Sequence, residues 1–349
     1  MNVLIRADAS LVIGSGHVMR CLTLADQLRS KGMNVAFVCR NVPGKMFELL
    51  TARGYQTVAI EGNWSQQFDA EETIHIAGRL FPDGLDWIVV DNYELDIAWE
   101  SRLRAHTRKF MVIDDLANRH HGCDLLLDQN YYRDLDQRYK GLVPEQCITL
   151  LGPSYLLLRP EFVAERQRLR NRDGVVRRIM IFFGGSDSTN QTKKAIEALR
   201  LLNRSDIHVD IVIGSANPFR NEIERLCSTT SNLIFHCQVS NMAELISSVD
   251  LAIGAGGSSM WERCFLGLPS LTVVFAANQE QTTEDVAETG AIKYLGWADK
   301  LTPVDYAFAI NEMIANPQEV QNISCAAHKL IGENRVSVSD AMFSMTRDN

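Results

Sequence analysis

Short runs of apolar and β-branched residues recur along this chain, and each is followed by a stretch long enough to hold a helix. In the first half they lie at residues 3–7, 35–39, 87–91 and 110–114, and in the second half at residues 178–183, 209–213, 233–235, 251–254 and 271–274. Runs of this length and composition are typical of buried strands. Strands that alternate with crossover helices pair in parallel. The sequence therefore predicts an α/β fold with parallel sheets.

The length of the chain predicts more than one domain, because its 349 residues exceed the roughly 100–200 residues of a typical domain. The segment 159–172 contains seven arginine or glutamate residues and no long apolar run, and residues 171–174 have the composition of a turn. We therefore expect two Rossmann-like, doubly wound parallel-sheet domains, residues 1–172 and 173–349, that face a cleft. Ligands of such sheets bind at the carboxyl ends of the strands.

Composition limits the class of ligand. The 35 Lys and Arg residues against 43 Asp and Glu give a net charge of −8, which argues against nucleic acid or an anionic membrane as a partner. No apolar run approaches the ~20 residues of a membrane-spanning helix. The eight cysteines form no Cys-x-x-Cys pair, so we expect buried free thiols. The first residues show no leader pattern. These features predict a cytoplasmic protein that holds an anionic ligand by local donors.

The strongest local motif is a glycine-rich turn between a buried strand and a helix, in residues 251–262. Gly256 and Gly257 are followed by Ser258 and Ser259, so backbone N–H groups and hydroxyls gather at the positive end of the helix. This arrangement suits a pyrophosphate. Glu262, one helical turn further on, is placed to accept hydrogen bonds from ribose hydroxyls. The alternative is a tight turn in which a serine caps the helix.

A turn near the N-terminus carries the candidate general base. Gly14 and Gly16 begin like a dinucleotide fingerprint, but Met19 stands where the third glycine belongs. The turn presents His17 in the first turn of a helix, where the helix dipole disfavours the imidazolium ion and favours the neutral ring. The alternative is a histidine that donates to a neighbouring carbonyl group.

Polar residues after two other predicted strands are weaker candidates. Asp91 and Tyr93 follow a strand of the first half, so they point to the ligand-binding edge, although Asp91 also fits a simple turn and Tyr93 a core position. Asn278 and Gln279 follow a strand of the second half and suit sugar hydroxyl or acetamido groups. The alternative for this pair is the polar start of a helix.

Two further local clusters each have a functional and an ordinary structural explanation. Gly185 and Ser186 lie in a Gly-Gly-Ser-Asp turn that suits a phosphate, and the alternative is a common turn in which Asp187 only caps the next helix. The histidines, cysteine and acidic residues between positions 114 and 123 invite a metal site, but adjacent residues of a strand or loop face opposite ways. We therefore expect no metal site there.

The motifs together resemble those of a known enzyme family. The similar segments are residues 5–8, 14–25, 91–93, 113–115, 123–130, 151–155, 158–162, 184–187, 254–262 and 278–279. The chain resembles the UDP-2,4-diacetamido-2,4,6-trideoxy-β-L-altropyranose hydrolases of pseudaminic acid biosynthesis, from residue 1 to about residue 300. The N-terminal segment and the Arg-Pro-Glu-Phe segment are specific, whereas the turn at 254–262 fits many nucleotide-sugar enzymes.

This resemblance implies the two-domain GT-B fold of MurG-like glycosyltransferases, UDP bound on the C-terminal domain, and hydrolysis without a metal or another cofactor. It also implies that His17 acts on the attacking water and that Tyr93 and Asn278 lie near the sugar, so these three are the expected catalytic residues. The expected substrate-binding residues are Asp8, Gly14, Gly16, Arg20, Gly185, Ser186, Gly256, Gly257, Ser258, Ser259, Glu262 and Gln279.

Two other functions fit the same residues. A GT-B glycosyltransferase would pass the sugar to an acceptor, and His17 would then deprotonate an acceptor hydroxyl in place of water. A non-catalytic nucleotide-sugar-binding module would leave His17 dispensable. Release of UDP from a UDP-sugar without an acceptor would favour the hydrolase.

Overall fold

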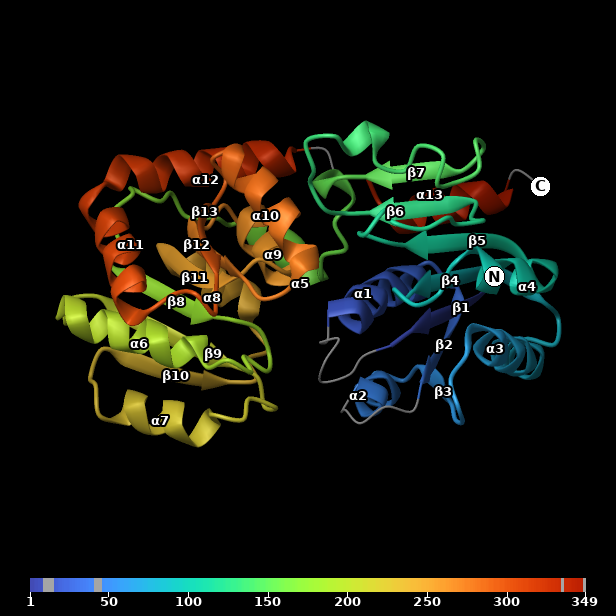
Figure 1. Cartoon of the computed structure of the whole chain (residues 1–349), viewed down its shortest axis with the longest axis horizontal. Coiled ribbons are helices and arrows are strands. Elements are labelled where there is room, and N and C mark those ends of the chain that lie inside the picture. Colours follow the sequence, from blue (N-terminus) through green and yellow to red (C-terminus); the bar gives the residue numbers. More distant parts are fainter. Residues whose placement is uncertain (9–15, 41–45, 334–335, 348–349) are drawn as a thin grey trace. The chain divides into compact units, whose positions relative to one another are not determined.

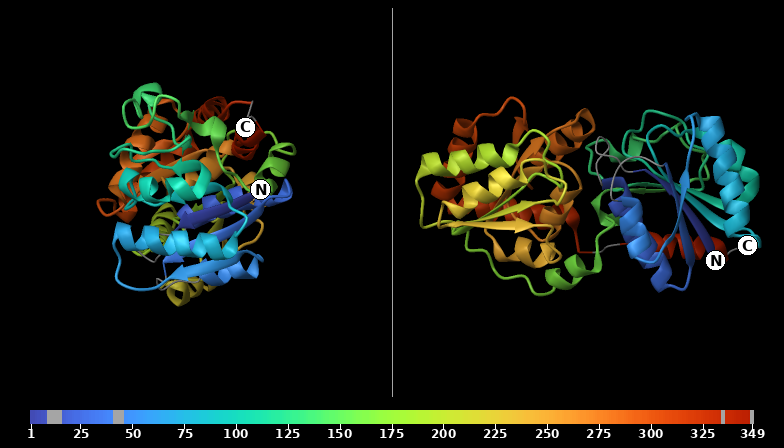
Figure 2. Two further views of the ribbon diagram at one scale, coloured as in Figure 1. Left: turned by 90° about the vertical axis from the view of Figure 1, so that its right-hand side faces the viewer. Right: turned by 90° about the horizontal axis from the view of Figure 1, so that it is seen from below.

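The computed structural model describes residues 1–8, 16–40, 46–333 and 336–347. The chain forms two compact units, Met1–Leu157 together with Arg335–Asn349, and Leu158–Asn334 (Figure 1). Each unit is built on one parallel sheet with helices on both faces (Figure 2). The predicted fold class is therefore confirmed.

The first unit contains a sheet of seven parallel strands, counted over the described residues, in the order β3-β2-β1-β4-β5-β6-β7. Its strands are β1 (Asn2–Ala7), β2 (Asn34–Arg40), β3 (Gln56–Ile60), β4 (Leu85–Asp91), β5 (Thr107–Ile113), β6 (Leu125–Asp128) and β7 (Ile148–Leu151). Its α-helices are α1 (Gly16–Ser30), α2 (Met46–Ala52), α3 (Gln66–Leu80), α4 (Ile97–Leu103) and α13 (Val338–Arg347).

Alternation along the strands of this unit builds two cores. Ile5 of β1 packs in a cluster with α1 and with Met342 of α13. The neighbouring Leu4 points the other way, into a cluster that includes Trp99 of α4. Successive side chains of a strand face opposite sides of the sheet, and both faces here are covered, so the strands read as continuous apolar runs.

The second unit contains a sheet of six parallel strands within the described residues, in the order β10-β9-β8-β11-β12-β13. Its strands are β8 (Arg178–Phe182), β9 (His208–Ile213), β10 (Leu233–Cys237), β11 (Leu251–Ala255), β12 (Ser270–Val274) and β13 (Lys293–Trp297). Its α-helices are α5 (Pro160–Arg166), α6 (Gln191–Leu202), α7 (Arg220–Ser228), α8 (Met242–Ser248), α9 (Ser258–Phe265), α10 (Ala277–Glu288), α11 (Pro303–Ala315) and α12 (Pro317–Ile331).

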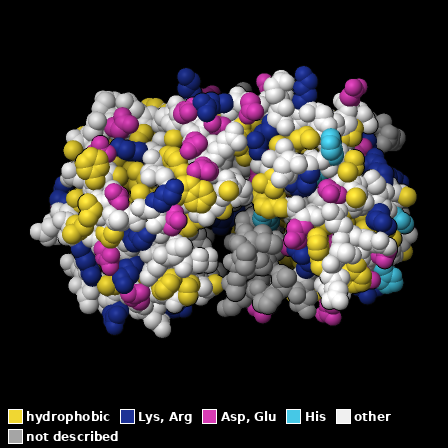
Figure 3. All heavy atoms as spheres, viewed as in Figure 1, with side chains coloured by type: hydrophobic (Ala, Val, Ile, Leu, Met, Phe, Trp, Pro, Cys, Tyr) yellow, Lys and Arg dark blue, Asp and Glu magenta, His cyan; other side chains and the backbone are white. Residues whose placement is uncertain are grey.

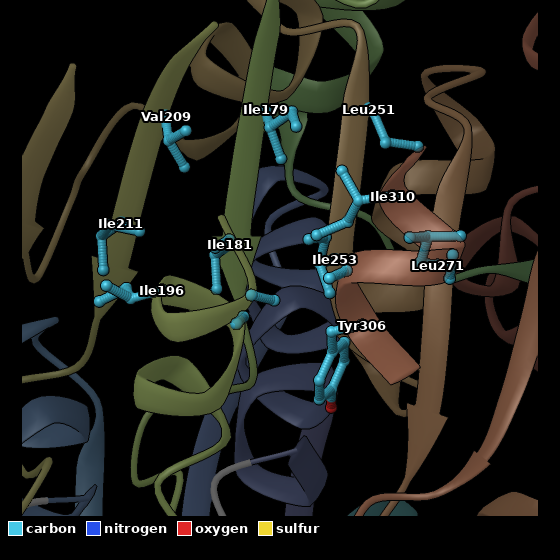
Figure 4. Packing of buried hydrophobic residues seen from close by; sticks show 14 of the residues in the cluster. Ile179, Ile181, Ile196, Val209, Ile211, Leu251, Ile253, Leu271, Tyr306 and Ile310 are labelled. Carbon is cyan, nitrogen blue, oxygen red and sulfur yellow. The ribbon is translucent and has the colours of Figure 1, made fainter. Parts of the chain in front are cut away.

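One core of the second unit lies between its central strands and helices α6 and α11. Ile181 of β8 and Ile253 of β11 point to the same face of the sheet, and there they pack with Ile196 of α6 and with Tyr306 and Ile310 of α11 (Figure 4). This packing fixes β8 and β11 side by side, so the turns that follow these two strands are held at one edge.

All nine apolar runs overlap a strand of the structure, but β3, β6, β7 and β13 were not predicted. β6 and β7 are only four residues long. β3 and β13 are edge strands whose side chains are mostly half-buried. Short strands and partly solvated edges carry too few apolar residues to stand out in a sequence.

The division of the chain differs from the expected one. The arginine-rich segment before residue 173 belongs to the second unit, because its arginines bind that unit's carbonyl groups. Arg172 donates to Leu266 O (2.9 Å) and Ile246 O (3.1 Å), and Arg170 donates to Val249 O (2.8 Å). At the other end, α13 packs on the first unit. The charged run that suggested the domain boundary is therefore part of the second unit.

The strand order gives each unit one switch point. In the first unit the chain moves from β1 outward to β2 and β3, and then from β4 outward the other way. In the second unit β8 and β11 are the corresponding neighbours. At such a point, the loops after the two central strands diverge to opposite faces and leave room for a ligand at the carboxyl edge. In the sequence, His17, Asp91, Gly185 and Gly256 all come at or after the ends of these central strands.

The surface mixes charges of both signs. On the face drawn in Figure 3, lysine and arginine side chains alternate with aspartate and glutamate over both units. All eight cysteines are free, but Cys325 is exposed, so the expectation of buried thiols is wrong for that residue. No helix in the described part of the chain has the length and apolar character to cross a membrane.

Candidate functional site

The candidate base of the first unit lies at its switch point. α1 begins at Gly16, as predicted, which puts His17 in the first turn, and Asp91 is the last residue of β4. His17 Nδ1 lies 2.5 Å from Asp91 Oδ1. The Asp91 side chain is fully buried, whereas His17 keeps 10% of its side-chain surface exposed. A buried carboxylate thus orients an imidazole that solvent can reach.

The carboxylate determines which ring nitrogen of His17 carries the proton. An ionised Asp91 can only accept hydrogen bonds, so Nδ1 donates to it. Arg20 Nη2, 3.2 Å from Nδ1, has no acceptor to offer and does not compete for this proton. In the neutral ring the lone pair is therefore on Nε2, which makes no hydrogen bond to any described residue. This is the tautomer that a general base requires.

Arg20 keeps Asp91 ionised. Its Nε and Nη2 donate to the two oxygens of Asp91 at 2.6 and 2.7 Å, and its Nη1 donates to Asp115 Oδ2 at 2.9 Å. Burial alone would raise the pKa of Asp91, but the charges of Arg20 and His17 and their hydrogen bonds hold this pKa well below its ordinary value. Asp91 is therefore available to stabilise an imidazolium ion at His17.

Tyr93 contacts the imidazole ring of His17. Its hydroxyl donates to Asp115 Oδ1 at 2.6 Å, and its ring meets His17 edge-on with the centroids 4.5 Å apart. Burial and the negative charge of Asp115 raise the pKa of Tyr93, so the phenol keeps its proton. The expected place of Tyr93 beside the sugar stays a prediction, but its contact with the candidate base is part of the structure.

Asp8 is buried and ties three strand ends together. Its carboxylate accepts hydrogen bonds from Arg6 Nη1 (2.5 Å), from the backbone N–H of Arg40 (2.7 Å) and from Asn92 Nδ2 (2.8 Å). Burial alone would raise the pKa of Asp8, but the Arg6 charge lowers it. Its binding of substrate stays a prediction. Gly14 lies outside the described residues.

The candidate pyrophosphate turn follows β11 in the second unit. Gly257 is the N-cap of α9, and no side chain caps this helix, so the alternative of a serine cap is wrong. Ser258 is exposed and Ser259 is half-buried. The first-turn N–H groups therefore have no side-chain partner, and two hydroxyls lie beside them. Such a turn offers several donors to an anion.

Close packing against α10 fixes this turn. A Cβ atom on Gly256 would lie 2.4 Å from Thr283 Oγ1, so only glycine fits. Gln279 spans the neighbouring turn, because its Oε1 accepts from Phe275 N at 3.0 Å, and its Nε2 lies against Gly257. The side chain predicted to bind sugar thus also holds two turns together. Asn278 is exposed in the first turn of α10.

Glu262 has a cationic neighbour that the sequence did not indicate. Arg159 Nη2 donates to Glu262 Oε1 at 3.1 Å, and Arg159 also pairs with Glu161 at 3.0 Å. Burial raises the pKa of Glu262, and the Arg159 charge opposes this effect. Oε2 accepts no hydrogen bond from the described residues, so it is open to a ribose hydroxyl. The ribose contact stays a prediction.

In the turn after β8, N–H groups at the start of the next helix already donate to a side chain of the turn. The Asp187 carboxylate accepts from the N–H groups of Gln191 and Thr192, both at 2.9 Å, at the start of α6. Asp187 thus accepts from the first N–H groups of α6, although the N-cap residue of this helix is Asn190, whose side chain accepts from Lys193 N. Gly185 is exposed and Ser186 half-buried beside it. Of the two turns at the switch point, the one that precedes α9 has the open donors.

The histidine and cysteine cluster between positions 114 and 123 is accounted for by other contacts. His121 is buried and lies 2.6 Å from Glu100 Oε1. Cys123 and Cys147 approach each other with their sulfur atoms 3.5 Å apart. Among the residues that the structure describes, no three His, Cys, Asp or Glu side chains gather as metal ligands.

Several residues that support the site escape sequence reasoning. The sequence places Asp91 at the ligand-binding edge but does not indicate its contact with His17, and it does not indicate Thr283. Arg263 gives a signal in hindsight, because it is a single cation among Trp261, Cys264 and other apolar residues of α9. These residues act through contacts with segments distant in sequence, which a local motif does not reveal.

Comparison with known proteins agrees with this picture. Residues 179–335 match the glycosyltransferase family 28 C-terminal domain. The chain is 26% identical to the UDP-2,4-diacetamido-2,4,6-trideoxy-beta-L-altropyranose hydrolase of Campylobacter jejuni over 291 residues, which cover 83% of this chain and 97% of that protein. The resemblance inferred from the sequence motifs is thereby confirmed.

Another relative is an uncharacterized protein of Methanocaldococcus jannaschii, 26% identical over 289 residues. The match covers 80% of this chain but only 57% of the archaeal protein. Among solved structures, MurG of Acinetobacter baumannii superimposes with a TM-score of 0.65 at 15% identity and covers 100% of this chain and 99% of MurG. At this identity the likeness concerns the fold, which is the predicted GT-B fold.

Proposed function

We propose that this chain is a nucleotide-sugar hydrolase that cleaves UDP-2,4-diacetamido-2,4,6-trideoxy-β-L-altropyranose into UDP and the free sugar. The similarity to the Campylobacter jejuni hydrolase over most of both chains supports the substrate, and the motif resemblance supports a role in pseudaminic acid biosynthesis. The observation that carries the proposal is the His17–Asp91 pair, because a hydrolase needs a base that can act on water.

In the proposed reaction, His17 Nε2 takes a proton from a water molecule while the water oxygen attacks the anomeric carbon. The positive charge that forms on the ring is stabilised by Asp91, which already accepts from Nδ1 at 2.5 Å. A well-placed general base contributes roughly 10²–10⁴-fold to the rate. Tyr93 restrains the ring from its edge, which limits the orientations that Nε2 can take.

The second unit holds the leaving group in this proposal. UDP leaves with the electron pair of the anomeric C–O bond, so its β-phosphate gains negative charge. The uncapped N–H groups and hydroxyls of the turn before α9 are suited to that charge. Glu262 Oε2 is open to accept from the ribose. Attack by water on the face opposite the departing UDP inverts the anomeric configuration, as in inverting glycosidases.

Incubation with the UDP-sugar in heavy-oxygen water tests which bond breaks. Cleavage at the anomeric carbon puts the label in the free sugar, whereas cleavage at phosphorus puts it in UDP. The sugar is analysed at early times, because ring opening exchanges the anomeric oxygen with the solvent. Label in the β-phosphate of UDP would refute the proposed mechanism.

Substitutions separate the roles of the two units. His17→Ala should abolish most turnover and leave UDP affinity nearly unchanged, because the base and the nucleotide site belong to different units. Glu262→Ala should weaken UDP binding, since a lost hydrogen bond costs roughly 1–3 kcal/mol. Near-normal turnover in His17→Ala would remove the base assignment and favour a binding module.

A glycosyltransferase is the second candidate. The match of residues 179–335 to a glycosyltransferase family 28 domain supports it, and the same base would deprotonate an acceptor hydroxyl. A hydrolase releases UDP at full rate without any added acceptor. A transferase releases it slowly until an acceptor is supplied, so the two rates distinguish the candidates.

A further inference from the structure

A buried cation without a carboxylate partner lies beneath the turn that precedes α9. Arg263 is fully buried. Its Nη2 donates to Ala255 O at 2.8 Å and its Nη1 donates to Ser259 Oγ at 3.1 Å, whereas its Nε has no hydrogen-bond partner. No carboxylate of the described residues lies within ion-pair distance of it. Burial lowers the pKa of Arg263 to about 10, so the group is charged at neutral pH.

The chain makes room for this cation at a central position of the sheet. A Cβ atom on Gly254 of β11 would lie 2.9 Å from Arg263 Nη1 and 2.5 Å from Phe182 O. Glycine within a strand weakens it, and a buried charge without a partner is costly. Both features occur at one point, directly below the open donors of the turn. An anion bound at those donors would supply the missing negative charge.

Arg263 also sets the direction of a hydroxyl group. Because Nη1 donates to Ser259 Oγ, the Ser259 hydroxyl proton is turned away from the guanidinium and is available to another acceptor. Nη2 holds Ala255 O, the last carbonyl of β11. Arg263 thus forms hydrogen bonds on both sides of the glycine turn, and its charge acts there through a medium of low dielectric constant.

We propose that Arg263 is a positioning residue for the diphosphate of a nucleotide ligand, acting by its charge and through Ser259. This inference rests on the proposed function, in that the turn before α9 binds UDP. A residue that only supported the fold would affect all ligands of the turn alike. A residue that acts by charge affects them in proportion to their phosphate charge.

The test is calorimetry on the full chain with UDP, UMP and uridine as ligands. Arg263→Met, which keeps the volume and removes the charge, should weaken UDP binding about tenfold or more, the range for hydrogen bonds to charged groups. It should weaken UMP binding less and change uridine binding less than about twofold on the same reasoning. Arg263→Lys should recover part of the loss. Arg225→Met, which removes an exposed cation from α7, is the matched control and should bind UDP normally.

Thermal unfolding without ligand provides a second readout. Arg263→Met removes the cost of burying a charge that has no carboxylate partner, and this gain offsets the loss of the two hydrogen bonds to Ala255 and Ser259. The variant should therefore unfold close to the wild type while binding UDP less well. Equal losses for UDP and uridine, or unchanged UDP affinity, would overturn the proposal. Wild-type protein that binds no UDP would instead refute the proposed function, and inorganic pyrophosphate would then be the probe for Arg263.

Discussion

Replacing Asp91 by asparagine is the sharpest test of the catalytic geometry, because it keeps the shape and removes the charge. Asp91 Oδ1 accepts from His17 Nδ1 and from Arg20 Nη2, and Oδ2 accepts from Arg20 Nε. Both carboxylate oxygens thus face donors. An asparagine amide must put its NH₂ group against one of them, and either choice breaks the network.

The two orientations have different consequences. If the NH₂ group faces Arg20 Nε, two donors face each other and the bidentate pairing with Arg20 is lost. If it faces His17, Nδ1 must become an acceptor, so the proton moves to Nε2 and the base is lost. Loss of the correct tautomer should lower kcat by about 10²–10⁴-fold. Arg20 keeps one partner, Asp115, so the loss of stability should fall near ~3 kcal/mol, the low end for a broken buried pair.

The assay is UDP release at saturating UDP-sugar, with UDP affinity measured in parallel. Asp26→Asn is the control, since Asp26 lies on α1, the helix that carries His17, and pairs at the surface with Arg29. We expect a large fall in kcat with unchanged UDP affinity for Asp91→Asn and no change for the control. A folded Asp91→Asn variant with wild-type kcat would refute the tautomer argument.

Two further changes probe other parts of the chain. Gly256→Ala should lose about 1–3 kcal/mol of stability and much of its UDP affinity, because its Cβ atom meets Thr283 Oγ1. Gly257→Ala is the control and should be tolerated. Thr283→Ala should rescue Gly256→Ala if the steric argument holds. Burial and the Asp115 charge raise the pKa of Asp128 to about 7, so the wild type loses stability as the pH rises from about 4 to 7, by as much as ~4 kcal/mol. Asp128→Asn should remove that slope in urea unfolding at pH 5 and 8, and a constant difference between the two proteins would contradict the assignment.

The sequence predicted the parts of the fold that are decided locally. Apolar runs located the central strands because both faces of each sheet are covered, and the position of His17 followed from a glycine turn and a helical pattern. The sequence could not predict the partners of these groups. Asp91 lies 74 residues from His17 in the chain, and its role depends on β1 and β4 being neighbours in the sheet.

The arginine-rich segment was misjudged for a related reason. Arg170 and Arg172 look like solvated linker residues, since charged side chains are usually exposed. Their partners are backbone carbonyl groups, which carry no signature in the sequence. The same holds for Thr283, whose effect on Gly256 is a matter of distance alone. Motifs identify groups that can do chemistry, whereas the groups that restrain them depend on tertiary contacts.

The two switch points have the same topology but carry different charged groups, and this difference fits the separate roles that we propose for the two units. In the first unit, the strand end at Asp91 carries a buried carboxylate against His17, and this carboxylate stabilises an imidazolium ion. In the second unit, the strand end before α9 carries open N–H groups above the unpaired charge of Arg263. That turn favours an anion and would oppose a protonated base. In the proposed reaction, the base and the leaving-group site are better kept in separate units, because each needs a local field of the other sign.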